Sequence, residues 1–144
     1  MSLKINSTIR NRKASFDYFF LKEFVAGIQL YGTEVKAIKD AKVSIVDTFC
    51  YFDKGELFVK GMNITEGTFF SHSPMRDRKL LLKRKELDKL ENELIPGLTI
   101  IVKKIFFSDR GKIKVEIALA KGKKSYDKRN SIKDRESARE LRSI

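Results

Sequence analysis

The chain has 144 residues, enough for one domain with a single core but not for two independent cores. It carries 31 Lys and Arg against 19 Asp and Glu, a net charge of +12, so we expect an anionic partner, with nucleic acid favoured over an acidic membrane. The sequence has neither an apolar run of about 18 residues that could span a bilayer nor the apolar stretch of a signal peptide at its start. These features predict a cytoplasmic protein without a membrane partner.

The basic residues are concentrated in three segments. Residues 1–13 hold four bases and no acids, residues 75–90 hold seven bases and three acids, and residues 121–144 hold nine bases and four acids. Outside these segments the charges nearly cancel. Separate basic segments are typical of surfaces that follow a phosphate backbone, whereas a solvated Lys-rich surface is the alternative.

The first half of the chain is rich in β-forming residues. Residues 16–30 predict a long strand that ends near Gly27, with its aromatic residues alternating onto one side. Thr33 is expected to cap a short helix. Residues 45–52 and 56–64 flank the turn sequence at 53–55, which predicts a hairpin in which Gly55 supplies the positive φ.

The second half predicts one helix and one further hairpin. Leu80, Leu87, Leu90 and Leu94 fall at helical spacing before Pro96 and Gly97 end the segment. Residues 99–107 and 112–119 flank a turn at 108–111, and the return strand points Ile113, Val115, Ile117 and Leu119 inward. Five or six strands with two helices fit a small antiparallel barrel.

The segment from Lys121 to the C-terminus has a different composition. Its apolar residues are too few and too scattered to offset the entropy of ordering the chain. We therefore divide the chain into a basic N-terminal arm at 1–13, a barrel domain at 14–120 and a basic tail at 121–144. The tail is expected to be disordered when free and to become helical where RNA neutralises its bases.

The residues that catalysis requires are scarce. Cys50 and His72 are the only cysteine and the only histidine, which predicts no disulfide, no zinc site and no cofactor. Cys50 lies in an apolar strand, where a thiolate is disfavoured, and His72 lies in a loop sequence, where a surface position or a phosphate contact is expected. The acids are scattered singly among bases, unlike those of a metal-dependent nuclease. The sequence thus favours a binding protein over an enzyme.

Several motifs in a fixed order carry a family resemblance. Together they resemble the SmpB (small protein B) family, the SsrA-binding proteins of bacterial trans-translation, from about Asn11 to the C-terminus. The motifs are Asn11-Arg12-Lys13-Ala14 before an aromatic strand, Ala26-Gly27-Ile28, Gly32-Thr33-Glu34-Val35-Lys36, residues 74–82 (PMRDRKLLL), residues 120–124 (AKGKK) and Asp127-Lys128-Arg129.

This resemblance implies a six-stranded antiparallel OB-like barrel with two or three flanking helices. It implies binding to the tRNA-like domain of transfer-messenger RNA and delivery of that RNA to stalled ribosomes for peptide tagging and ribosome rescue. The basic tail would lie in the mRNA channel near the decoding centre of the small subunit. We expect a monomer.

The resemblance and the basic segments together indicate two sets of functional residues. The expected RNA-binding residues are Asn11, Arg12, Lys13, Arg76, Arg78, Lys79, Leu81 and Lys114. The expected ribosome-engaging tail residues are Gly122, Lys123, Lys124, Tyr126, Lys128, Arg129, Lys133 and Arg135. Lys114 should point outward and suits a phosphate contact, whereas Leu81 suits either the core or an exposed contact with an unstacked base.

The chain departs from the family pattern at Val25, where many members have a Glu that helps to bind the RNA, so that contact is not carried over. Two other functions compete with trans-translation. A general tRNA-type OB module would display aromatic platforms on exposed strand faces, and an RNA-processing enzyme would need convergent catalytic groups. The aromatics expected in the buried first strand favour recognition of folded RNA by shape and phosphate contacts.

Overall fold

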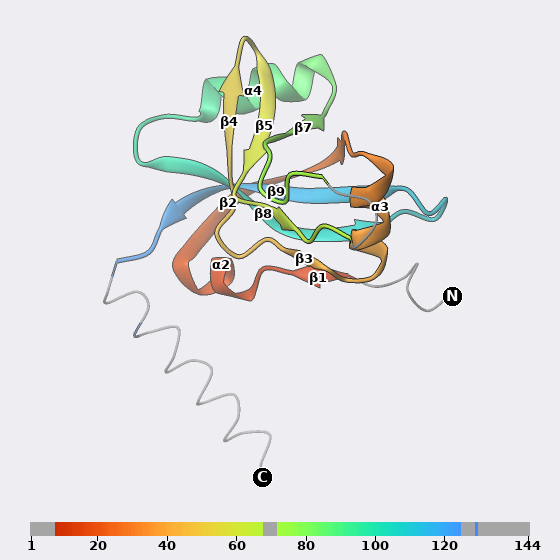
Figure 1. Ribbon diagram of the computed structural model, residues 1–144. Coiled ribbons are helices and arrows are strands. Elements are labelled where there is room, and N and C mark those ends of the chain that lie inside the picture. Colours follow the sequence, from red (N-terminus) through yellow and green to blue (C-terminus); the bar gives the residue numbers. More distant parts are fainter. Residues whose placement is uncertain (1–7, 68–71, 125–128, 130–144) are drawn as a thin grey trace.

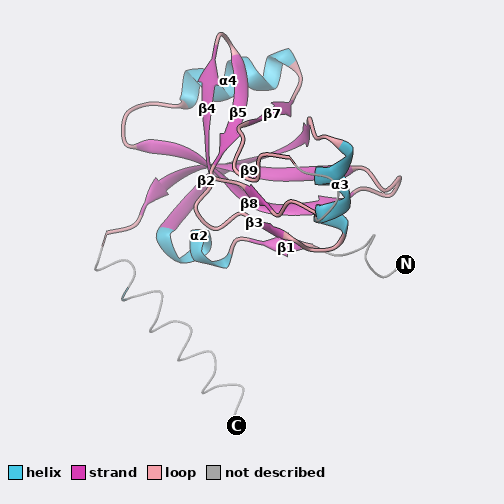
Figure 2. Cartoon of the chain, viewed as in Figure 1, coloured by secondary structure: helices cyan, strands magenta, loops and turns pink. Residues whose placement is uncertain are grey.

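The computed structural model describes residues 8–67, 72–124 and 129 (Figure 1). The described chain is mainly β, with three helices placed around a sheet (Figure 2). In chain order the elements are β1 (Ile9–Arg10), α2 (Arg12–Asp17), β2 (Tyr18–Ile28), α3 (Gly32–Lys39), β3 (Val43–Ser44), β4 (Phe49–Asp53), β5 (Glu56–Lys60), β6 (Asn63–Ile64), β7 (Arg78–Leu81), α4 (Arg84–Glu93), β8 (Leu98–Phe107) and β9 (Ile113–Gly122).

The main sheet is antiparallel and has seven strands in the order β1-β8-β4-β5-β7-β2-β9. An additional pairing of β8 with β9 connects six of these strands in a ring, and β1 pairs with β8. The sheet therefore takes in Ile9 and Arg10 from the segment 1–13, and Lys121 and Gly122 from the segment 121–144. Strands β3 and β6 form a separate two-stranded sheet.

The ring is not an evenly closed barrel, which corrects the expectation of a closed six-stranded one. Strand β9 pairs along most of its length with both β2 and β8, whereas β4 meets β8 only at Cys50 and Ile100. Strands β2 and β7 share two register pairs. Because β4 has five residues and β7 has four, β4 cannot match the ten-residue β8 along its length, and β7 cannot match the eleven-residue β2.

Both predicted hairpins are confirmed. Strands β4 and β5 are joined through Lys54 (φ 52°) and Gly55 (φ 80°), and positive φ at both central residues is the backbone of a type I′ turn. Strands β8 and β9 are joined by a turn in which Gly111 has φ 77°. Val115, Ile117 and Leu119 are buried on the return strand, as their alternation predicts.

Three predicted elements begin at residues other than those expected, one of them β4, which starts at Phe49 rather than at residue 45. The long strand starts at Tyr18, since residues 12–17 form α2, and a register shift between Phe20 and Lys22 breaks the alternation of its aromatic side chains. Tyr18, Phe20 and Phe24 are therefore only partly buried, packed against the two core clusters, while Phe19 is 44% exposed. Helix α3 begins at Gly32 rather than after Thr33, whose hydroxyl lies 2.9 Å from His72 Nδ1 instead of capping the helix.

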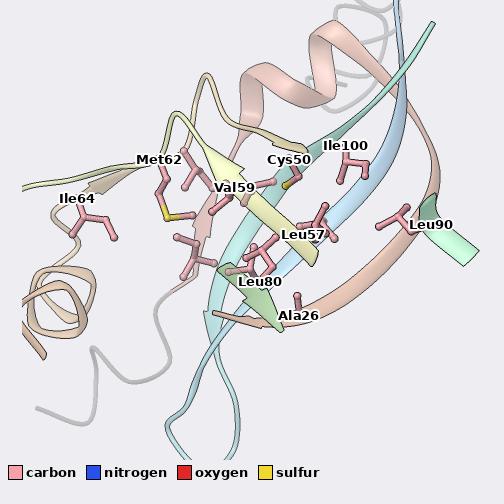
Figure 3. Packing of buried hydrophobic residues seen from close by; sticks show 14 of the residues in the cluster. Ala26, Cys50, Leu57, Val59, Met62, Ile64, Leu80, Leu90 and Ile100 are labelled. Carbon is pink, nitrogen blue, oxygen red and sulfur yellow. The ribbon is translucent and has the colours of Figure 1, made fainter. Parts of the chain in front are cut away.

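The prediction that the four leucines lie on one helix is only partly confirmed. Leu80 belongs to β7, while Leu87 and Leu90 lie on the buried face of α4. All three nevertheless pack in the same hydrophobic core, so their prediction as core residues is confirmed. Figure 3 shows this core, in which Leu57 and Val59 of β5 meet Ala26 of β2, Leu80 of β7 and Ile100 of β8. A smaller cluster under α2 contains Ala14, Ile101, Ala118 and Ala120.

A buried ion cluster joins α3 to β7. Glu34 and Arg78 are both fully buried, and Arg78 Nε donates to Glu34 Oε2 over 2.5 Å. The guanidinium also donates to the backbone oxygens of Met62 (2.8 Å) and Pro74 (3.1 Å). The partly exposed Arg76 donates to both carboxylate oxygens of Glu34, at 3.1 and 2.6 Å. One carboxylate thus fixes two arginines from the basic segment 75–90.

Replacing Glu34 by Gln should destabilise the fold strongly, because Arg78 would be left as a buried charge without a counter-ion. Removing one partner of a buried pair costs about 3–5 kcal/mol of unfolding free energy. Chemical denaturation measures this loss. The control variant Lys13→Ala breaks the exposed Lys13–Asp47 pair and should leave the denaturation midpoint near that of the unmodified protein. Equal midpoints for all three proteins would contradict a structural role for the cluster.

The same pair should make stability depend on pH. Burial raises the pKa of the Glu34 carboxyl, but hydrogen bonds from Arg76, the Tyr31 amide and Arg78 outweigh it and hold that pKa below its ordinary value. A carboxyl with a lowered folded pKa contributes stability that is complete above its unfolded pKa, about 4.3, and is lost as the pH falls through the folded value. The stability difference between the unmodified protein and Glu34→Gln should therefore narrow below about pH 4. A constant difference across this range would disprove the linkage.

Candidate nucleic-acid interface

An open groove of about 420 Å³ lies where β2, β7 and β9 meet α3 and the β8–β9 turn. Figure 1 shows α3 beside this turn at the end of the sheet. Three of the ten lining residues are lysines and none is acidic, so the groove combines apolar walls with positive charge. Its lining consists of Gly27, Ile28, Leu30, Val35, Lys39, Leu81, Gly111, Lys112, Ile113 and Lys114.

The strand register explains why the groove forms at this point. Gly27 pairs with Leu81 on one side and with Lys114 on the other. Residues paired across antiparallel strands point to the same face of the sheet, so the two side chains rise on either side of a position that has none. A Cβ atom at Gly27 would lie 3.3 Å from the Cβ of Leu81, tighter than ordinary contact. Glycine therefore leaves the floor of the groove open.

Two of the expected RNA-binding residues line this groove. Leu81 is 44% exposed, which resolves the ambiguity between a core and a surface position in favour of the surface. Lys114 is half-buried at the rim. Lys39 and Lys112, both exposed, are further cations that the sequence prediction missed, because only the fold brings α3 and the β8–β9 turn together.

The three expected RNA-binding cations of segment 75–90 are paired with acidic residues of the protein itself. Arg78 is fully buried on Glu34, so its guanidinium holds the fold and does not face a ligand. Arg76 is partly exposed, but its donors are directed at Glu34 and at backbone oxygens. Lys79 is half-buried, and its Nζ lies 3.5 Å from Glu56.

Asn11 is also an internal anchor. It is 4% exposed, its side-chain oxygen accepts from the Ala14 amide at the start of α2, and its Nδ2 donates to Ile45 O (2.9 Å) and Val102 O (3.0 Å). Its side chain thus ties α2 to two distant segments of the chain. The sequence did not predict this burial, because Asn11 is polar and is followed by two basic residues.

Arg12 and Lys13 lie elsewhere on the molecule. Both are exposed on α2, where the side chain of Lys13 contacts Asp47 over 3.1 Å. The hydrogen bond from Lys13 to Asp47 raises the pKa of the Lys13 ammonium. Helix α2 leads into β2 at Tyr18, whereas the groove lies near Gly27, roughly 30 Å away along a strand that rises about 3.3 Å per residue. The expected RNA-binding residues therefore fall at two ends of one strand.

The tail begins at the α2 end. Gly122 pairs with Tyr18, and the amide of Lys123 donates to Asp17 O over 2.8 Å. The Lys123 ammonium lies over the Phe19 ring, 4.9 Å from its centroid. Lys124 and Arg129 are exposed. Tyr126, Lys128, Lys133 and Arg135, and with them the predicted conformation of the tail, lie outside the described residues.

Val25 marks the departure from the family pattern. Its side chain is 52% exposed on β2, two residues from Gly27. Its partner across β9 is Glu116, whose carboxylate oxygens lie 3.4 Å from Lys103 and 3.1 Å from Lys104. The carboxylate beside Val25 is therefore that of Glu116, and it is paired with Lys103 and Lys104 of β8.

The described residues offer little for catalysis. Cys50 is buried, and this burial raises the pKa of its thiol. His72 is buried rather than on the surface, with Nε2 at 2.9 Å from Ile64 O, which corrects the expectation of a surface or phosphate contact. Within the ranges 8–67 and 72–124, no group of three or more His, Cys, Asp or Glu side chains could hold a metal ion. None of the described helices has the length and apolar character needed to cross a membrane.

Comparison with known proteins relates the chain to one family. The family model described as SmpB protein matches residues 8–144. The SsrA-binding protein of Christiangramia forsetii is 53% identical over 143 residues, covering 96% of this chain and 91% of that protein. The SsrA-binding protein of Cytophaga hutchinsonii is 51% identical, covering 96% and 94%.

A solved structure supports the same assignment. It is described as "tmRNA-SmpB: a journey to the center of the bacterial ribosome", and its chain is 38% identical to this one. The match covers 87% of this chain and 94% of the other, with a TM-score of 0.71. With the resemblance that the motifs carried thus confirmed, the chain belongs to the SmpB protein family.

Proposed function

We propose that this protein binds the tRNA-like domain of transfer-messenger RNA and delivers that RNA to stalled ribosomes for trans-translation. The observation that carries the proposal is the groove at Gly27, where an exposed leucine faces a lysine across a position without a side chain. Phosphates would meet Lys39, Lys112 and Lys114, while an unstacked base would pack on Leu81. The names of the relatives, SsrA-binding proteins, support the same RNA.

The body of the protein acts in this proposal as an OB-like barrel that displays two separate basic ends. The groove end would grip the RNA, while the α2 end with Arg12, Lys13 and the departing tail would face the decoding centre and the mRNA channel of the small subunit. The ring of six paired strands supports the OB-like interpretation. We further propose that the protein is a non-enzymatic, cytoplasmic monomer.

The groove can be tested by competition between three RNAs at a stated salt concentration. The labelled tRNA-like domain should be displaced more readily by itself than by tRNA, and least by duplex RNA. Equal displacement by all three would instead favour a general RNA-binding module. Stating the salt matters because counterion release makes these affinities strongly salt-dependent.

In the same assay, Lys114→Ala should weaken binding roughly tenfold or more, since a hydrogen bond to a charged group contributes about 1.5–3 kcal/mol. It should also reduce the slope of log affinity against log salt by about one. Leu81→Ala should weaken binding while leaving this slope unchanged. The controls Lys60→Ala and Ile95→Ala remove exposed residues of the same types away from the groove lining. The groove assignment fails if these controls weaken binding as much as the groove variants do.

Removing residues 125–144 should distinguish the function of the groove end from that of the tail. The cut is placed after Lys124 because β9 extends to Gly122 and Lys123 bonds to Asp17, so an earlier cut would shorten the sheet. We expect affinity for the isolated tRNA-like domain to stay within about threefold of the full chain, whereas peptide tagging on stalled ribosomes is abolished. A parallel loss of both activities would contradict a mechanism with two surfaces.

A further inference from the structure

Tyr31 lies next in sequence to a residue of the groove lining and is exposed to an unusual degree. Its side chain is 60% exposed, the highest value among the large hydrophobic residues in the described part of the chain. It directly follows Leu30, which lines the groove together with Val35 and Lys39 of α3. An aromatic ring at this place is within one residue of the surface proposed to hold RNA.

The ring is held from one side by a guanidinium. Arg76 Cζ lies 4.2 Å from the centroid of the Tyr31 ring. The Nε and Nη2 atoms of Arg76 donate to the two oxygens of Glu34, Nη2 also donates to Gln29 O, and Nη1 donates to Asp77 O. A guanidinium fixed by so many bonds is a rigid support for an aromatic ring.

The same buried carboxylate also fixes the backbone of the tyrosine. The Tyr31 amide donates to Glu34 Oε1 over 2.8 Å. Glu34 therefore sets the position of both the ring and the cation beneath it, and its own position is fixed by the buried Arg78. Glu34 thus pairs with two arginines, and Arg76 is the one whose positive charge lies against the ring.

A rigid, exposed aromatic ring that rests on a cation matches the chemistry of a base-stacking platform. Every nucleobase presents a flat π-face, so stacking on such a ring tolerates different bases. A positive charge beneath the ring also favours the phosphates that accompany each base. A lone cation–π pair would stabilise the start of α3 equally well, so the platform must be separated from this simpler role by experiment.

We propose that Tyr31 stacks on an unpaired nucleobase of the bound RNA, next to the nucleotides held in the groove, and that Arg76 is the residue that positions its ring. This inference rests on the proposed function, because it requires an RNA in the groove. It also assigns Arg76 a role other than the direct RNA contact expected from the sequence. The ligand class is a single-stranded or loop nucleotide.

The test uses the absence of tryptophan from the chain. Tyr31→Trp creates a protein with one tryptophan, whose emission should be quenched when the tRNA-like domain of transfer-messenger RNA binds, since stacking on a base quenches indole fluorescence. Phe49→Trp places the same reporter at a position that is 44% exposed and does not line the groove, and its emission should not change. Quenching of both reporters to the same extent would overturn the stacking assignment.

Affinities of substituted proteins provide the second measurement. Tyr31→Ala and Tyr31→Leu should each weaken RNA binding about tenfold, whereas Tyr31→Phe keeps the affinity, because stacking needs the ring and not its hydroxyl. The thermal midpoints of the Phe and Leu variants are measured alongside. A loss of RNA affinity in the Leu variant that merely followed a loss of stability would assign Tyr31 a structural role only and overturn the proposal.

Arg76→Lys tests the positioning role. Lysine keeps the charge but loses the planar fork that binds Glu34 and supports the ring. We expect weaker binding in Arg76→Lys and no further loss when it is combined with Tyr31→Ala, because both act through the same ring. Losses that add fully would indicate that Arg76 contacts the RNA itself and would overturn the positioning role.

The outcomes for this inference and for the proposed function can be told apart. If the unmodified protein binds the tRNA-like domain in preference to tRNA, but Tyr31→Ala binds equally well and Tyr31→Trp is not quenched, only the stacking platform is overturned. If the unmodified protein shows no preference among the three RNAs, the proposed function fails, and the platform falls with it.

Discussion

The buried carboxylate of Glu34 is the constraint on which the groove end of the molecule depends. It accepts hydrogen bonds from Arg78, Arg76 and the Tyr31 amide, and it thereby joins β7, the segment before it and the start of α3. A charge buried without water must be fully paired. Any rearrangement of α3 or β7 would break this pairing, so the side of the groove that these elements build is held firmly.

Gly27 determines the shape of the groove in a complementary way. Its neighbours Leu81 and Lys114 belong to strands far apart in the sequence, and β2 brings them together because it pairs with both β7 and β9. An apolar side chain and an ammonium group on either side of an open floor can recognise a base and a phosphate at the same time. The floor stays open because the position carries no side chain.

Local patterns predicted the hairpins well, and the family motifs predicted two groove residues. The alternation of β9 and the turn residues Gly55 and Gly111 act over a few neighbours, so they could be recognised directly. Arg78 and Asn11 could not be assigned in this way, because their buried partners, Glu34 and the oxygens of Ile45 and Val102, lie 34 to 91 residues away. Net charge locates a basic segment but does not show which of its cations face inward. Leu80 was misassigned because a strand residue and a helix residue can fill one core.

Strand β2 and its partner β9 also determine how far apart the two basic ends lie. The pairing runs from Tyr18 and Gly122 at one end to Gly27 and Lys114 at the other, and the tail leaves the sheet beside α2. A hydrogen-bonded ladder resists stretching, so this pair of strands behaves as a spacer of fixed length. A transcript seated at one end would therefore be presented at a constant separation from whatever the α2 end of the molecule contacts.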